Sequence, residues 1–126
     1  MTDFLFIHGA GHGAWTWDYV KGAMEDAQRR TATLYHEMYT PGILLAPDLP
    51  GHGSRYNQED PRAISLESCA EDISRSAEEA GLKRPVMVVH DLSGLIALEA
   101  ARRMKEPPQR IIFLGAVVPH FCANVF

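Results

Sequence analysis

Three polar loops in the sequence follow short apolar runs and carry the residue types that nucleophilic chemistry uses. They are His8-Gly9-Ala10-Gly11-His12-Gly13, the stretch from Asp48 to Ser54, and His90-Asp91-Leu92. A carboxylate such as that of Asp91 can attack an sp³ carbon and form an ester intermediate, which an activated water then hydrolyses. A glycine-rich loop can aim backbone N–H groups at the negative charge that develops during such a reaction. The three loops together are therefore stronger evidence for a catalytic site than any one of them alone.

The elements around these loops must bring them to one place. Continuous apolar runs predict strands at residues 4–8, 43–47, 85–90 and 110–118, and helical spacing predicts helices at residues 17–38, 66–80 and 92–105. Ser65 is the expected N-cap of the second helix and Gly81 its C-terminal stop. This β-α-β-α-β-α-β order predicts one α/β domain over residues 1–126, a three-layer fold with a parallel sheet. The loops then share the carboxyl edge of the sheet, where such folds bind ligands.

Composition and charge narrow the classes of partner. The chain has 126 residues and a formal net charge of −4, with no basic stripe, which argues against nucleic acid as a partner. No apolar run approaches the roughly 18 residues that a membrane span needs. The N-terminus has an acid before a short apolar run, unlike a signal peptide, so we expect a cytoplasmic protein. We expect a small-molecule substrate.

Neither a cofactor nor a metal is expected. The glycine-rich loop lacks the lysine and the glycine order of phosphate-binding loops. His8 and His12 stand on a loop without a carboxylate at helical spacing, which is a weak pattern for zinc.

The stretches "FLFIHGAGHGAWTW", "APDLPGHG" and "VVHDLSGLIALEAA" resemble, in order and spacing, the α/β-hydrolase superfamily. The resemblance runs from about Phe4 to Pro119, and the start is similar to the methylesterase and hydroxynitrile-lyase-like branch. It implies a partial α/β-hydrolase core that lacks the cap and the C-terminal strands. The loop that begins at Asp48 corresponds to a scaffold of the pocket rather than to a catalytic motif.

The resemblance also assigns roles to individual positions. Asp91 takes the nucleophile position, which is usually serine, and the backbone N–H groups of Ala10 and Leu92 take the places of the oxyanion-hole donors. The expected pocket residues are Gly9, Gly11, His12 and His90. Ser93 and Gly94 fall on the two glycines that follow the nucleophile in the family, and Val89 replaces a glycine before it. A frame with Ser93 as the nucleophile would push that serine into the helix.

Three functions stay open at this point. The first is an esterase-like hydrolase of a small uncharged substrate with an altered nucleophile position. The second is an epoxide or haloalkane hydrolase with Asp91 as nucleophile, although Leu92 stands where those relatives have an aromatic residue and Gly11 where they have proline. The third is a non-catalytic binding or interaction protein, in which Asp91 simply caps the next helix. A carboxylate facing two oxyanion donors would also fill the hole meant for a substrate oxygen.

The resemblance further implies that a catalytic acid and a histidine follow late in the fold, whereas His120 is the only histidine after Asp91. The sequence therefore presents part of an active site. The strand predicted over residues 110–118 would be an open sheet edge, and such an edge invites a partner strand. We expect self-association, or a complementary chain, at this edge.

Overall fold

The sheet is parallel throughout, as the sequence predicts. The computed structural model describes residues 2–35 and 41–118, and in it the strand order is β2-β1-β3-β4. The strands are β1 (Phe4–Ile7), β2 (Leu44–Leu45), β3 (Val86–Asp91) and β4 (Arg110–Ala116). Because all four strands run the same way, the loops after β1, β2 and β3 emerge at one edge.

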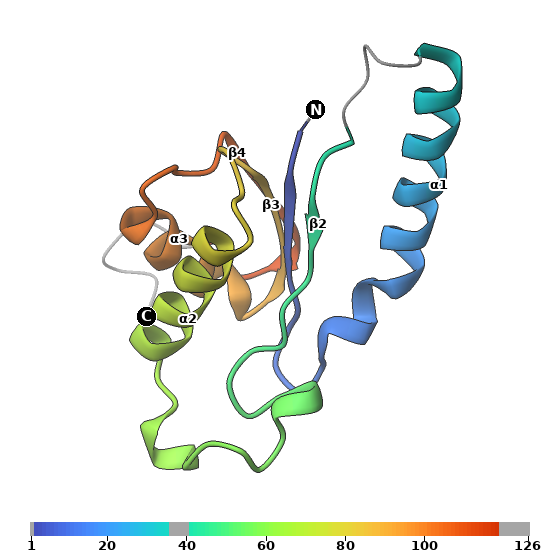
Figure 1. Cartoon of the computed structure of the whole chain (residues 1–126). Helices are drawn as coiled ribbons and strands as arrows, with labels where there is room; N and C mark the ends of the chain where they lie inside the picture. Colours follow the sequence, from blue (N-terminus) through green and yellow to red (C-terminus); the bar gives the residue numbers. More distant parts are fainter. Residues whose placement is uncertain (1, 36–40, 119–126) are drawn as a thin grey trace.

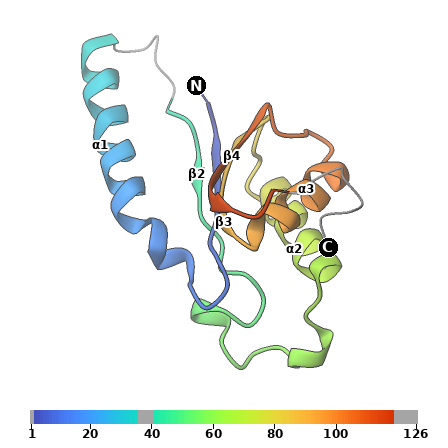
Figure 2. The same cartoon turned by 180° about the vertical axis from the view of Figure 1, so that it is seen from behind.

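Helices cover both faces of this sheet. Figure 1 shows α1 alone on one face and α2 with α3 on the other, and Figure 2 shows the same arrangement from behind. The helices are α1 (Asp18–Tyr35), α2 (Leu66–Glu79) and α3 (Ser93–Arg103), with short 3-10 turns at Ala14–Trp17, Gly53–Arg55 and Pro61–Ala63. The predicted three-layer α/β architecture, a partial α/β-hydrolase core, is confirmed.

The core divides into two layers because alternate residues of a strand point to opposite faces. Met87 and Val89 pack with Ile73 of α2 and Ala97 of α3 on one side of the sheet. On the other side, Trp17 packs with Phe6, Val86 and Val88. The predicted strand at residues 85–90 reads as a continuous apolar run because both of its faces are covered.

The first helix differs most from its prediction. The chain enters it through a 3-10 turn, so the α-helix begins at Asp18 instead of Trp17. Val20 and Leu34, which the helical spacing placed on a core face, are exposed, Leu34 by 74%. The physical reason is that α1 is the only described helix on its side of the sheet, so no second helix covers Val20 and Leu34, whereas Met24 packs against the sheet. Residues 36–38 of the predicted helix lie outside the described residues.

The second helix begins and ends where the sequence indicates. The Ser65 side chain accepts a hydrogen bond from the Ser68 backbone N–H, and the Ser68 hydroxyl accepts one from the Ser65 backbone N–H. This reciprocal pair satisfies two N–H groups that the first turn leaves free. Gly81 follows the helix with φ +74°, a conformation that glycine adopts without steric cost.

Asp3 fixes the opposite end of the sheet. Its buried carboxylate accepts hydrogen bonds from the backbone N–H of Ile43 at 2.9 Å and of Lys83 at 2.8 Å. These two residues precede β2 and β3, so one side chain on β1's leading end holds both neighbouring strands in place. No helix in the part of the chain that the structure describes is long and apolar enough to cross a membrane.

Candidate active site

A tight turn between β3 and α3 presents Asp91. The residue ends β3 with φ +57°, in the left-handed region that non-glycine residues rarely occupy. Leu92 is the N-cap of α3 and makes no side-chain capping bond, so Asp91 is not the capping residue of that helix. The turn forms with Val89 fully buried, although the family pattern has glycine at that position. A side chain held in such strained backbone is a frequent feature of functional sites.

The carboxylate of Asp91 faces two backbone N–H donors. Ala10 N–H donates to Asp91 Oδ2 at 3.1 Å across 81 residues of sequence. The backbone N–H of Leu92 and that of Ala10 together hold the pKa of the Asp91 carboxyl below its usual range. The residues expected to form an oxyanion hole are therefore brought together, and the carboxylate occupies their donors. Asp91 is ionised at neutral pH, as nucleophilic attack by a carboxylate requires.

Two glycines of the first loop serve different needs. A Cβ at Gly9 would lie 2.7 Å from Asp91 Cβ and 2.8 Å from His90 Nδ1, so only glycine lets the loop approach the turn this closely. Gly11 is exposed with φ +75° and has open space around it, so its requirement is conformational. Gly9 therefore lies directly against Asp91.

His12 and His90 lie beside the carboxylate. Their ring centroids are 5.6 Å apart in an edge-on arrangement, and the His12 ring also stacks on Trp15 at 5.8 Å. Both histidines are half-buried, and the field of each contributes to lowering the pKa of Asp91. His90 Nδ1 is buried without a hydrogen-bond partner. Of the four residues predicted to line a pocket, Gly9, His12 and His90 lie near Asp91.

The buried His8 side chain holds the first loop in place through two hydrogen bonds. Its Nε2 accepts a hydrogen bond from the Leu49 backbone N–H at 3.0 Å, so its Nδ1 carries the proton and donates to the Gly9 carbonyl at 2.8 Å. Burial lowers the pKa of this imidazole, which keeps it neutral. His8 therefore shapes the loop and is not a general base for Asp91.

Asp48 joins the first two loops. Its carboxylate accepts hydrogen bonds from Ala14 N–H at 2.7 Å, from Ser54 N–H at 3.1 Å and from the Ser54 hydroxyl at 2.7 Å. Although burial opposes ionisation, these donors hold the pKa of Asp48 below its usual range. The stretch from Asp48 to Ser54 thus acts as a scaffold for the glycine-rich loop.

Ser93 is not placed to act as a nucleophile. It is the first residue of α3, only 1% exposed, and its hydroxyl donates to the backbone carbonyl of His8. Gly94, which follows, lies against the Val117 carbonyl so closely that a Cβ would overlap it. The alternative frame with Ser93 as the nucleophile is therefore wrong, and neither its tether nor this close contact was anticipated from the sequence.

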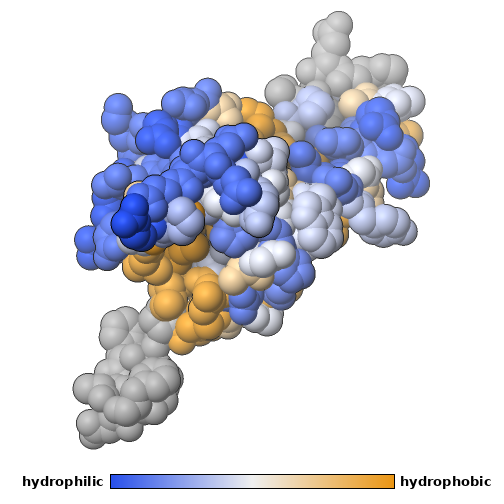
Figure 3. Space-filling model, turned by 90° about the horizontal axis from the view of Figure 1, so that it is seen from below, coloured by the Kyte–Doolittle hydropathy of each residue, from blue (hydrophilic) through white to orange (hydrophobic). Residues whose placement is uncertain are grey.

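The surface around Asp91 is apolar. Leu92 is 51% exposed and Leu114 is 48% exposed, and Leu114 lies beside His90 in the sheet register. Val117 is also exposed, and its backbone N–H donates to the Asp91 carbonyl at 2.9 Å. Figure 3 looks at the molecule from the side where the strands end and shows one apolar patch on a face that is otherwise largely hydrophilic. Such surroundings suit an uncharged ligand better than an ionic one.

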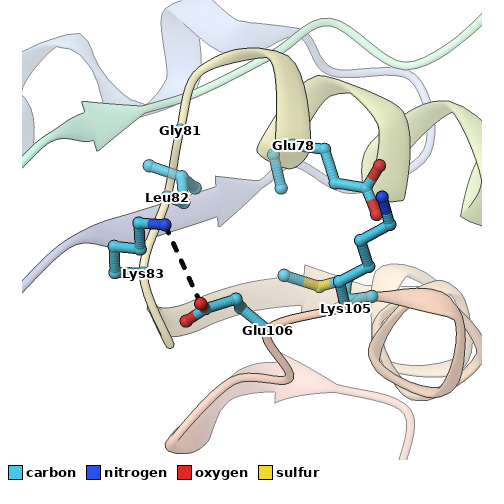
Figure 4. Close-up of a pocket in the computed structure, with 8 residues that line it drawn as sticks. Glu78, Gly81, Leu82, Lys83, Lys105 and Glu106 are labelled. Atoms are coloured by element: carbon cyan, nitrogen blue, oxygen red, sulfur yellow. Dashed lines mark ion pairs between the residues drawn. The ribbon is translucent and has the colours of Figure 1, made fainter.

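A hollow lies at the edge of the sheet opposite to Asp91. It has a volume of about 280 Å³, and Lys83 Nζ and Glu106 Oε1 approach to 3.8 Å beside it (Figure 4). Its lining residues are Ala77, Glu78, Gly81, Leu82, Lys83, Met104, Lys105 and Glu106. These residues precede β3 and β4, so the hollow is at the amino ends of the strands. Ligands of parallel α/β sheets bind at the carboxyl ends, which favours the Asp91 side.

The family resemblance implies a catalytic acid and a histidine that follow the nucleophile in the chain. His120, the only histidine after Asp91 in the sequence, lies outside the described residues. Within residues 2–35 and 41–118, the structure contains no group of three or more histidine, cysteine, aspartate or glutamate side chains that could hold a metal ion. The described residues supply an ionised carboxylate, two N–H donors and exposed apolar side chains close by.

Comparison with known proteins identifies a protein family and individual relatives that this chain resembles. The model of the alpha/beta hydrolase family matches residues 4–124. The probable esterase PIR7A of Oryza sativa subsp. indica is 29% identical over 116 residues, which are 92% of this chain and 39% of that protein. A carbendazim hydrolyzing esterase of Nocardioides sp. is 25% identical over 119 residues, 94% of this chain and 43% of that protein. The solved methylesterase MES16 from Arabidopsis superposes with a TM-score of 0.72 at 20% identity, covering 95% of this chain and 45% of that one. The chain therefore spans less than half the length of these relatives.

Proposed function

Because the chain belongs to the alpha/beta hydrolase family, in which it resembles the methylesterase branch, we propose that it carries the nucleophile side of a hydrolytic site for a small uncharged substrate. Asp91 is the attacking residue in this proposal, and Ala10 and Leu92 are the oxyanion donors. The remaining strands of the fold supply the catalytic histidine and its acid. The observation that carries the proposal is the hydrogen bond from Ala10 N–H to Asp91 Oδ2 at the tip of a strained strand–helix turn.

This geometry favours attack on an sp³ carbon over attack on an ester carbonyl. If Asp91 Oδ1 attacks the carbon of an epoxide, the carbon–oxygen bond of the ring breaks and the ring oxygen leaves as an alkoxide, which takes up a proton. Oδ2 then becomes the carbonyl oxygen of the new ester and already has an N–H donor on it. A water activated by a histidine attacks the carboxyl carbon, and the same donor stabilises the oxyanion that forms. When the oxyanion collapses, the bond between the carboxyl carbon and the alkyl oxygen breaks, the alkyl oxygen takes the proton from the histidine, and the diol leaves with Asp91 restored as a carboxylate.

An esterase is the second candidate, favoured by the relatives, which include a probable esterase and a carbendazim hydrolyzing esterase. In this candidate the carboxylate stands where a serine nucleophile belongs. The difficulty is that a substrate carbonyl oxygen needs the N–H groups that Asp91 occupies. An ester substrate would have to displace the carboxylate from donors that lower its pKa, which costs binding energy.

Oxygen labelling separates the two candidates. Hydrolysis should be carried out for a single turnover in heavy-oxygen water, with a protein that includes the later strands of the fold. If Asp91 is alkylated, water attacks its carboxyl carbon, and we expect the label in the Asp91 side chain, detected by mass spectrometry of the peptide that contains it. Label found only in the product would contradict the carboxylate mechanism. A surface aspartate such as Asp18 should stay unlabelled in either case.

We also propose that the outer edge of β4 receives a further strand of the hydrolase fold. β4 pairs with β3 on one side, and its Ile112 and Leu114 side chains are exposed next to that open edge. Arg110, at the start of β4, is the one charged residue of this strand, and residues 111–118 carry no charge that would oppose pairing. The relatives extend well beyond the length matched by this chain, which argues for strands of the same fold as the occupant.

The isolated chain should therefore self-associate through β4. We expect Leu114→Lys to shift the chain toward monomer in analytical ultracentrifugation, because a lysine on an open edge opposes strand addition. Val20→Lys, on the exposed face of α1, is the matched control and should leave the association unchanged. A wild-type chain that is monomeric at all concentrations, or equal effects of the two variants, would argue against pairing at this edge.

A further inference from the structure

We infer that Ser93 is a positioning residue: its hydroxyl holds the backbone of His8 so that Ala10 N–H, two residues further on, faces Asp91. The catalytic meaning of this tether rests on the proposed function, because it matters for hydrolysis only if Asp91 reacts. The physical coupling between Ser93 and Asp91 does not depend on that function and can be measured directly.

The tether continues the contact between β1 and β3 beyond their last paired residues. The two strands are in register from Phe4 beside Val86 to Ile7 beside Val89. His8 follows the last pair, and there the Ser93 hydroxyl, from the first turn of α3, donates to its carbonyl. A buried carbonyl requires a hydrogen-bond donor. At His8 a side-chain hydroxyl is the donor, where a backbone N–H of the neighbouring strand would otherwise serve.

The same segment is held from its other side by the His8 ring. Leu49 N–H donates to one ring nitrogen, and the other nitrogen donates to the Gly9 carbonyl. His8 is fully buried, so neither its ring nor its carbonyl can exchange these partners for water without opening the loop. The backbone from His8 to Ala10 is therefore fixed between the scaffold loop and the first turn of α3.

Ser93 also belongs to the turn that carries Asp91. The two residues are separated only by Leu92, and the Asp91 side chain receives the Ala10 N–H at 3.1 Å. The Ser93 hydroxyl thus completes a closed set of contacts. It binds the His8 carbonyl, and the backbone continues from His8 to Ala10, whose N–H binds the Asp91 side chain. Removing that hydroxyl leaves the Ala10 hydrogen bond without its nearest support, while the hydrophobic contacts of α3 stay in place.

The test is the titration of Asp91 in the full chain, followed by carbon-detected NMR. In Ser93→Ala we expect the pKa of Asp91 to move up toward its ordinary value, because a displaced Ala10 N–H no longer stabilises the carboxylate. The Ala10 amide should exchange with solvent about tenfold faster, as expected for the loss of one supporting hydrogen bond. Ser74→Ala, at a buried serine of α2, is the matched control and should leave both readouts unchanged.

Ser93→Cys is a second variant: it keeps a buried side chain of similar shape, but its thiol is a weaker hydrogen-bond donor than the hydroxyl. It should raise the pKa of Asp91 in the same direction as Ser93→Ala. A folded variant of either kind in which Asp91 titrates as in the wild type would overturn the proposal. Loss of folding in both variants would also overturn it, because Ser93 would then serve the stability of the sheet. If the coupling holds but the labelling experiment finds no alkylated Asp91, the positioning role stands and only the proposed function fails.

Discussion

Replacing Asp91 by asparagine is expected to reduce hydrolysis by at least about 10⁴-fold in a protein that carries the later strands of the fold, because loss of a nucleophile leaves only binding and oxyanion stabilisation. Asparagine keeps the shape of the side chain and its Oδ1 can still accept the Ala10 N–H. It lacks the negative charge that attack on carbon requires. The kcat for an epoxide substrate, measured under saturating conditions, is the appropriate readout.

The control for this variant is Asp18→Asn, at an exposed position in the first turn of α1. It removes the same charge from the protein and should leave kcat within a factor of two or so, as exposed substitutions usually do. An Asp91→Asn protein that retains most of the wild-type rate, with its fold intact, would remove Asp91 from the mechanism. The carboxylate would then be a structural feature of the turn.

Asp91→Ser tests the second candidate from the other direction. If the site descends from a serine esterase, this exchange frees the Ala10 and Leu92 N–H groups and restores a hydroxyl at the tip of the turn. Ester hydrolysis should then appear or increase. If the carboxylate is the working nucleophile, the same exchange should abolish epoxide hydrolysis, so one variant assayed on two substrates separates the candidates.

The sequence predicts the order of strands and helices well because each strand is a short apolar run and the helices between them show apolar residues at helical spacing. It also predicts that Ala10, Asp91 and Leu92 meet, since parallel strands bring the loops after β1 and β3 to the same edge. These features depend on local residue types and on the handedness and direction of the sheet.

The contacts that fix the site join residues far apart in the sequence, so no local sequence pattern predicts them. The Ser93 hydroxyl reaches a carbonyl 85 residues earlier, and Asp3 receives N–H groups from residues 40 and 80 positions later. Each bond joins a side chain to backbone, so the partner's residue type carries no signal in the sequence. The exposure of Leu34 is missed for a related reason, since helical spacing predicts an apolar face but not what covers it.

Gly94→Ala is expected to destabilise the chain by about 3 kcal/mol, at the upper end of overpacking effects, because the new Cβ meets backbone instead of a movable side chain. Gly94 is the second residue of α3, and a Cβ there would overlap the Val117 carbonyl, just after β4. The Val117 N–H also donates to the Asp91 carbonyl at 2.9 Å. To make room, α3 and the end of β4 must separate, which strains the turn that carries Asp91.

Gly22→Ala is the matched control for this prediction. Gly22 lies within α1, and a Cβ there meets nothing within 4 Å. Alanine should therefore stabilise the chain by up to about 1 kcal/mol through helix propensity alone. Urea unfolding of the two variants should move the midpoint in opposite directions. Equal midpoints for the two would mean that α3 does not pack against the end of β4 this closely, and the close approach that Gly94 permits would then have no part in shaping the site.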